Sequence, residues 1–196
     1  MVHPRAVSFN QVSKQARSRP GGGPILGRGT YDPPTQMPNE QTLYGNPSPC
    51  YAFTAQIAEV EVDDQTGEIR LVSYAVADDI GRPINPMLAE GQIEGCIGYG
   101  FGLTLTEEMV CEKGKVINPN FMDYRVPVAP DLPHIRPKLT DTLDPNGPFG
   151  AKSASEISID AVPAAIANAI YDAVGVRMRS LPITPEKVLT ALKKKG

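Results

Sequence analysis

A stretch rich in proline and glycine, residues 20–49, constrains the fold of this chain more than any other feature. It contains the runs PGGGP, YDPP and GNPSP and has few apolar side chains. Proline cannot donate a backbone hydrogen bond, and a segment that buries little apolar surface does not offset the entropy lost when it becomes ordered. We therefore expect residues 20–49 to be extended and irregular, and to lie on another surface.

The chain is expected to have two parts. Residues 1–49 combine this extended arm with a short helix over residues 8–19, where a weak apolar stripe follows Ser8, a residue type that caps helices. Residues 50–196 carry most of the apolar side chains and must form the core. With 196 residues in all, one domain of ordinary size is expected.

Two strands are predicted at the start of the second part. Apolar side chains alternate on one face over residues 51–57 and continue at Val60 and Val62 on the other face. This change of phase predicts a β-bulge. Residues 63–67 (DDQTG) have turn composition, and residues 69–77 form a second apolar strand.

Helices and a further hairpin follow. Helices are predicted over residues 86–103, from a cap at Asp160 to Gly175, and from Thr184 to the terminal lysines. A hairpin is predicted around the turn at residues 112–115, and a turn rich in proline and glycine over residues 141–150. Hairpins mixed with helices are typical of an α+β fold.

Four glycines lie on one face of the helix predicted over residues 86–103. Gly91, Gly95, Gly98 and Gly102 recur at spacings of three and four residues, and each costs about 1 kcal/mol relative to alanine in a helix interior. Two interpretations account for this cost: tight packing against another element, or close approach of a ligand to the backbone. The two interpretations are compatible.

Composition and charge exclude several classes of protein. The formal net charge of −3 argues against binding to nucleic acid or to acidic membranes. No apolar run comes close to the roughly 18 residues that span a bilayer. The first residues, MVHPR, lack the apolar core of a secretory signal, so a cytoplasmic location is expected.

Cysteine and histidine are too few for a conventional metal site. Cys50, Cys96 and Cys111 have the spacing of neither a zinc site nor an iron–sulfur site, and we interpret them as free thiols. His3 and His134 are the only histidines. No metal ligand is therefore predicted, and a metal bound by this protein needs other anchors.

The segment that most suggests chemistry is FGAKSASE, residues 149–156. Its small side chains, Ser153, Ala154 and Ser155, allow a large ligand to approach backbone N–H groups. Glu156 ends the segment just before an apolar helix. A lone glutamate facing a pocket is a plausible general base, and a glutamate at a helix start is also stabilised by the helix dipole. The residues alone leave both interpretations open.

Several motifs together resemble one family. They are GQIEG at residues 91–95, GYGFGL at 98–103, LTEE at 105–108, NPNFMDY at 118–124, GPFGAK at 147–152, AIANAI at 165–170 and LPITP at 181–185. In this order and spacing they resemble the C-terminal part of the molybdopterin-binding subunit of the xanthine oxidase (molybdenum hydroxylase) family. The resemblance covers residues 8–192 and implies the C-terminal part of that family's second molybdenum-cofactor-binding domain.

The resemblance also implies a site. It places Gln92 beside the pterin of a molybdenum–pyranopterin cofactor, either molybdopterin or its dinucleotide form. It makes Glu156 the active-site base and places Ser153, Ala154 and Ser155 against the cofactor. The family's loop reads GVGEPP where this chain reads SASEIS. The glutamate is retained, but the missing glycine and prolines imply a different pocket shape.

The implied activity is hydroxylation of an electron-poor carbon with oxygen drawn from water. The first choice of substrate is an N-heteroaromatic such as a purine or nicotinate, and the second is an aldehyde. The family's upstream cofactor motifs are absent, which implies a larger molybdopterin-binding partner chain, an iron–sulfur subunit with 2Fe–2S clusters, and a flavin subunit that binds FAD. The alternative is a non-catalytic assembly subunit, although a pure scaffold has no need of the retained Gln92 and Glu156.

Overall fold

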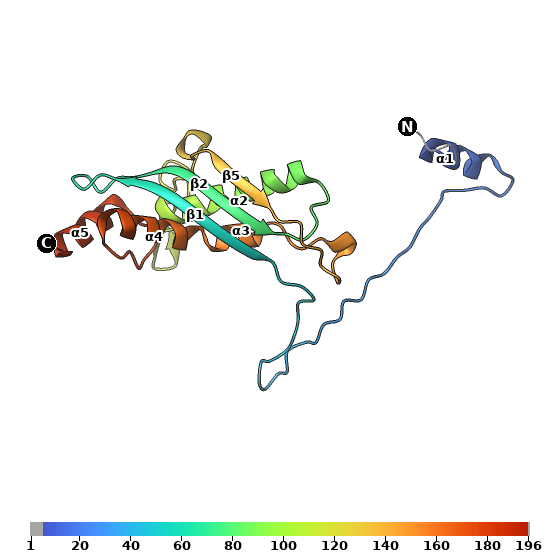
Figure 1. Cartoon of the computed structure of the whole chain (residues 1–196), viewed down its shortest axis with the longest axis horizontal. Coiled ribbons are helices and arrows are strands. Elements are labelled where there is room, and N and C mark those ends of the chain that lie inside the picture. The colour runs from blue at the N-terminus through green and yellow to red at the C-terminus, as the bar shows by residue number, and fades with distance from the viewer. Residues whose placement is uncertain (1–5, 196) are drawn as a thin grey trace. The chain divides into compact units, whose positions relative to one another are not determined.

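The structure, a computed structural model, describes residues 6–195. The chain forms two compact units, Met1–Pro34 and Thr35–Gly196. The first contains one helix, and the second contains a three-stranded sheet with helices packed against it (Figure 1).

Helix α1 (Phe9–Ser18) confirms the predicted N-terminal helix. Ser8 Oγ accepts a hydrogen bond from the backbone N–H of Gln11, and the Gln11 side chain accepts one from the backbone N–H of Ser8. This reciprocal capping box fixes where the helix begins. None of its residues is buried, so its apolar stripe has no partner within the first unit.

The backbone of the predicted arm is irregular, as expected from its proline and glycine content. From Gly23 to Ala52 the backbone forms no helix and no strand apart from an isolated bridge between Gln36 and Asn46. Within that bridge, the Asn39 side chain accepts hydrogen bonds from two following backbone N–H groups and closes a tight turn. Such local bonds order the arm without giving it a core of its own.

The sheet consists of β1 (Phe53–Val62), β2 (Ile69–Asp79) and β5 (Ile135–Leu139), in the order β1-β2-β5. β1 and β2 are antiparallel, as predicted, whereas β5 runs parallel to β2 and was not predicted. β5 contains Pro137, which removes a backbone donor and is tolerated because this strand lies at an edge.

The predicted bulge exists, but on the other strand. The register shifts so that Glu59 pairs with Ser73 and Val60 with Leu71, which leaves Val72 as the extra residue on β2. Along β1 the alternation of exposed and partly buried side chains is unbroken. The change of phase in the sequence arises because β1 carries apolar side chains on both faces, one of which is exposed.

Four helices complete the second unit: α2 (Pro86–Leu105), α3 (Glu156–Asp160), α4 (Val162–Val174) and α5 (Pro185–Lys195). α4 packs against β1 and α2 packs against β5, so both cover the sheet, and they also contact each other. The prediction that Asp160 caps the long helix is wrong. Asp160 ends α3, and α4 begins after Ala161 without a side-chain cap, with Pro163 in its first turn.

The core lies between the sheet and these helices. Its fully buried apolar side chains are Tyr74, Ile93, Ile97, Val162, Ile166, Ile170 and Val188. The stretch Glu156–Val174, which comprises α3 and α4, meets the length and hydropathy criteria for crossing a membrane, although polar side chains interrupt it. Three of the seven core side chains come from this stretch, and a core helix passes the same test.

The remaining elements are short. The predicted hairpin is present as β3 (Cys111–Glu112) and β4 (Lys115–Val116), shorter than expected because α2 continues to Leu105. Its turn residues Lys113 and Gly114 both have positive φ, as a two-residue hairpin turn requires. Two 3-10 turns, Ala129–Asp131 and Pro148–Gly150, complete the structure.

Candidate functional site

The segment that contains Glu156 (residues 149–156) is hydrogen-bonded near its start to the residues that follow β2. The backbone N–H of Lys152 donates to the carbonyl of Ile80 (2.7 Å), and the N–H of Arg82 donates to the carbonyl of Gly150 (2.8 Å). Between them, Gly81 has a positive φ, and a Cβ at this position would collide with the Gly150 carbonyl. Only glycine allows the two backbones to approach this closely.

An ion pair reinforces this junction. Lys152 Nζ lies 2.7 Å from Asp79 Oδ2, and both side chains are largely buried, with exposed fractions of 10% and 18%. The Thr142 hydroxyl and the Gly81 N–H also donate to Asp79. Burial raises the pKa of Asp79, but these hydrogen bonds and the charge of Lys152 outweigh burial and hold the pKa below its ordinary value of 3.8.

The lowered pKa predicts how stability depends on pH. A carboxylate whose pKa is lower in the folded state stabilises the fold above its unfolded pKa, and this contribution disappears as the pH falls through the folded pKa. We therefore expect Asp79→Asn to reduce the free energy of unfolding by a constant amount above about pH 5, and by progressively less below about pH 4. Urea denaturation across this range measures the difference. A difference that grows as the pH falls would contradict the assignment.

Asp78, the preceding residue, points into the core and reaches the other end of the same segment. It is fully buried, and the Ser158 hydroxyl donates to its Oδ2 at 2.5 Å. Within the described part of the chain its Oδ1 has no hydrogen-bond partner. Gln56 extends the network by donating to the Ser158 carbonyl and accepting from the Tyr74 hydroxyl. Burial, and secondarily the Asp78 charge, raise the pKa of Tyr74, so this hydroxyl stays protonated.

Cys96 lies on α2, which packs against α3, the helix that begins at Glu156. Its thiol is buried. Burial raises the pKa of Cys96, the Gln92 and Ser155 side chains lower it, and the Asp78 charge raises it. The thiol is therefore protonated near neutral pH.

The predicted site residues belong to two parts of the second unit: Gln92 lies on α2, and residues 153–156 lead into α3, which packs against α2. Gln92, Ser153 and Glu156 are exposed, while Ala154 and Ser155 are partly buried. Glu156 is the first residue of α3, so the helix-start geometry considered for it is present.

The glycines of α2 divide into two groups. A Cβ on Gly91 or Gly95 would meet nothing within 4 Å, whereas a Cβ on Gly100 would lie 2.6–2.9 Å from the side-chain atoms of Val162. Gly102 is similarly restricted by the Glu107 side chain and by Pro127. Packing therefore explains the glycines in the second half of the helix. In the first half, next to Gln92, it does not, and the bare backbone faces open space.

Sequence reasoning missed the residues that anchor the loop. Asp78, Asp79 and Lys152 were not singled out. One signal was available: Tyr74, Val76 and Asp78 share the inward phase of β2, which marks Asp78 as a buried carboxylate in need of a partner. That the partner is Ser158 follows only from the fold.

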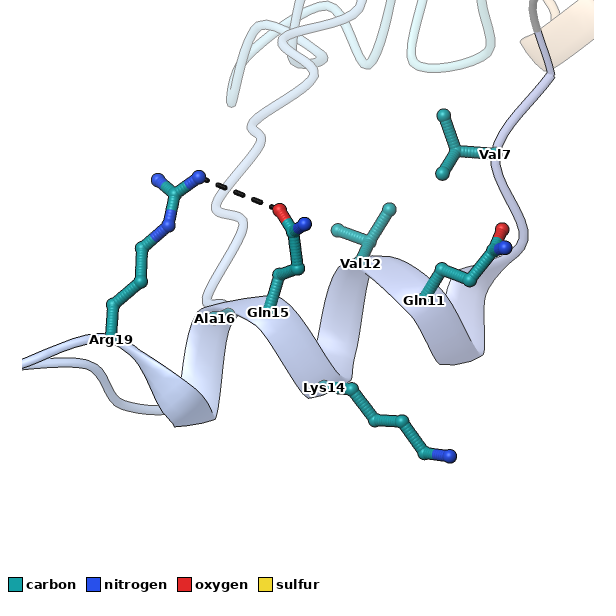
Figure 2. A pocket seen from close by; sticks show the side chains of 7 residues that line it. All are labelled: Val7, Gln11, Val12, Lys14, Gln15, Ala16 and Arg19. Atoms are coloured by element: carbon teal, nitrogen blue, oxygen red, sulfur yellow. Dashed lines mark hydrogen bonds between the residues drawn. The ribbon is translucent and has the colours of Figure 1, made fainter.

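The best-formed hollow on the first unit does not include Gln92 or Glu156. A hollow of about 600 Å³ runs along α1, where Gln11, Val12 and Gln15 line it and Arg19 donates to Gln15 (Figure 2). Within residues 6–195, no three histidine, cysteine, aspartate or glutamate side chains are grouped so that they could hold a metal ion.

Comparison with known proteins identifies the family. The family described as "Molybdopterin cofactor-binding domain" matches residues 1–133, more than half of the chain. The chain is 37% identical over 190 residues to the probable hypoxanthine oxidase XdhD of Escherichia coli, and this alignment covers 96% of the chain and 18% of the relative. It is 39% identical over 152 residues to the 6-hydroxypseudooxynicotine dehydrogenase complex subunit gamma of Paenarthrobacter nicotinovorans, and this alignment covers 76% of the chain and 19% of the relative.

Solved structures agree. The aldehyde oxidoreductase from Desulfovibrio gigas superimposes with a TM-score of 0.74 at 32% identity, over 81% of this chain and 17% of that one. The chain thus spans less than a fifth of the length of these relatives. The expected α+β fold and the expected family are both confirmed: this chain belongs to the molybdopterin cofactor-binding domain family of the molybdenum hydroxylases.

Proposed function

We propose that this chain forms one wall of the cofactor and substrate site of a molybdenum hydroxylase, in which Gln92 contacts the pterin and Glu156 is the base. The observation that carries the proposal is the packing of α2, which carries Gln92, against α3, which begins at Glu156. This contact supports the proposal because the resemblance assigns both segments, far apart in the sequence, to the cofactor.

The residues of these two segments suit a molybdenum–pterin group. Gly91 and Gly95 leave an open, unobstructed stretch of helix on either side of Gln92. A large planar ligand can approach such a backbone closely, while the Gln92 amide can both donate to it and accept from it. The side chains of Ser153 and Ala154 are also small, so they obstruct such a ligand little. The group is therefore expected to be held through its pterin, without a metal ligand from residues 6–195.

When bound, the molybdenum centre supplies a Lewis acid that activates a water-derived oxygen and an acceptor for two electrons. Glu156 supplies the base. Its exposed carboxylate takes the proton as oxygen is transferred to carbon, and the surrounding small residues leave room for the substrate. Lys152 and Ser158 lie on either side of this segment and fix its position.

For the substrate we propose an N-heteroaromatic ring as the first choice, such as a purine or nicotinate. An aldehyde is the second choice. The relative that covers 96% of this chain is named a probable hypoxanthine oxidase, which favours a purine. Another relative is named an aldehyde oxidoreductase molybdenum-binding subunit, which keeps aldehydes open. The side chains that select among them are expected on the larger molybdopterin-binding chain.

The proposed assembly contains that larger chain, an iron–sulfur subunit and a flavin subunit, in the cytoplasm. One relative is named as a subunit of a dehydrogenase complex, which supports a multi-subunit enzyme. The unpartnered apolar stripe of α1 and the extended arm are suited to lie on the larger chain, because neither buries apolar surface within its own unit. Electrons then leave the site through the 2Fe–2S clusters.

Isotope labelling of the holoenzyme, purified with its partner chains, tests the proposal. Hypoxanthine, nicotinate and benzaldehyde are each supplied in oxygen-18-labelled water under an artificial electron acceptor. We expect at least one to give a product with one oxygen atom from water and two electrons transferred, from a preparation that contains molybdenum and pterin. A molybdenum-loaded preparation that oxidises none of the three would favour the non-catalytic assembly subunit. Oxygen incorporated from O₂ would instead refute hydroxylation with oxygen from water.

A further inference from the structure

We propose that Asp78 and Asp79, consecutive residues at the end of β2, are positioning residues that hold the Glu156 segment at its two ends. Consecutive residues of a strand point to opposite faces of the sheet. Asp79 therefore binds Lys152, which precedes the segment, while Asp78 binds Ser158, which follows it. We call these contacts the outer and the inner anchor.

The segment depends on these anchors because its own structure is weak. Helix α3 has five residues, and its N-cap Ser155 makes no side-chain capping bond. A helix this short does not persist without tertiary contacts. Apart from the hydrogen bonds within α3 itself, the segment's internal support is weak: the Ser158 N–H donates to the Ser155 carbonyl at 3.2 Å, and the Ser158 hydroxyl donates to the Ala154 carbonyl at 3.5 Å. The direction of the Glu156 carboxylate is then set by where Lys152 and Ser158 are held.

Core packing alone does not explain Asp78. Its side chain is fully buried, and Oδ1 has no hydrogen-bond partner among the described residues. A buried carboxylate with an unsatisfied oxygen destabilises a fold, so an apolar residue would pack better here. Retaining the aspartate is explained if the inner anchor must fix Ser158. The same charge also raises the pKa of the Cys96 thiol on α2, the helix that packs against α3.

The outer anchor is similarly specific. The Lys152 ammonium is shielded by its 5.9 Å approach to the Phe53 ring and by its low exposure, so water competes little for Asp79. Asp79 is oriented in turn by the Thr142 hydroxyl and the Gly81 N–H. An exposed ion pair in the same sheet, Arg70–Glu61, has none of these features and serves as the matched control.

Hydrogen–deuterium exchange of the full chain tests the anchors without reference to activity. Lys152→Met removes the outer anchor and keeps the aliphatic stem, and Ser158→Ala removes only the hydroxyl of the inner anchor. We expect either change to accelerate exchange in peptides covering residues 150–160 by about 10-fold, with the sheet unaffected. Lys152→Arg should restore protection, and Glu61→Gln should change nothing in this region. Unchanged exchange at residues 150–160 in both anchor variants would overturn the proposal.

The effect of the anchors on catalysis rests on the proposed function. It is measured in the holoenzyme with the substrate that the isotope-labelling experiment identifies. Displacing a catalytic group by about 1 Å can cost 100-fold in rate, so we expect Lys152→Met and Ser158→Ala to lower kcat by about 10- to 100-fold at unchanged molybdenum content and KM. Lys152→Arg should recover most of kcat. Faster exchange with normal kcat, in an enzyme that Glu156→Gln inactivates, would overturn the positioning role. Normal turnover of Glu156→Gln itself would instead refute the proposed function, and the exchange experiment would still decide whether the anchors exist.

Discussion

Replacing Glu156 with glutamine is expected to lower holoenzyme turnover by about 10²- to 10⁴-fold, the usual effect of removing a general base. The substitution keeps the size and hydrogen-bonding reach of the side chain but removes its capacity to accept a proton. Glu156 is exposed, and its side chain forms no hydrogen bond or ion pair within residues 6–195, so folding should be unaffected. Molybdenum content, measured by mass spectrometry of the purified enzyme, should remain near that of the wild type.

A second glutamate in this chain provides the control. Glu186 lies in the first turn of α5, so Glu186→Gln repeats the same chemical change at another helix start. Its effect should be confined to a small change in stability, with turnover unchanged. If Glu156→Gln resembles Glu186→Gln, with full turnover at full molybdenum loading, then Glu156 only starts a helix and the base lies elsewhere.

Gln92→Ala should behave differently from Glu156→Gln. It removes an amide that we place against the pterin, which leaves a cofactor hydrogen bond unpaired at a cost of about 1–3 kcal/mol. Cofactor occupancy and activity should therefore fall together, whereas Glu156→Gln lowers activity alone. The side chain of Gln92 also lowers the pKa of the buried Cys96 thiol, so a thermal denaturation curve is needed to separate loss of cofactor from loss of fold.

The elements that were predicted correctly have their sequence signals within or next to their own residues. α1 has a serine cap with Gln11 in place to complete a capping box, α4 ends at Gly175 with positive φ, and β2 is a long apolar run. The missed elements lack such signals. β5 is five residues long and contains a proline, and its pairing with β2 crosses a long stretch of chain. α3 is a single turn held by tertiary contacts.

The same distinction applies to the site. Gln92 and Glu156 were predicted because each lies in a motif that can be recognised on its own. The Asp78–Ser158 contact joins residues 80 positions apart, and Asp79–Lys152 joins residues 73 apart. No local pattern specifies such pairs. The inward phase of Asp78 indicates that a partner is needed, but its identity depends on the register of β2 against the loop.

The glycines of α2 allow the strongest test of where the cofactor lies. Replacing glycine with leucine should lower the stability of the fold at Gly100, whereas at Gly95 it should lower cofactor content instead. At Gly100 a leucine would collide with Val162, which is fully buried and branched at Cβ. Overpacking by even a few methylenes typically costs 1–3 kcal/mol, so Gly100→Leu should destabilise the fold by at least about that amount. A lowered urea midpoint in this chain measures it.

Gly95→Leu should leave this chain stable but prevent cofactor binding. A Cβ at Gly95 meets nothing within 4 Å, and leucine is favoured over glycine in a helix by about 0.8–1 kcal/mol, so the urea midpoint should be unchanged or slightly higher. If the pterin lies against this half of the helix, the leucine side chain occupies its place, and molybdenum and pterin content should fall almost to zero. Size-exclusion chromatography of the holoenzyme checks that the partner chains still assemble. An assembled Gly95→Leu enzyme with full molybdenum content would show that the exposed glycines face something other than the cofactor.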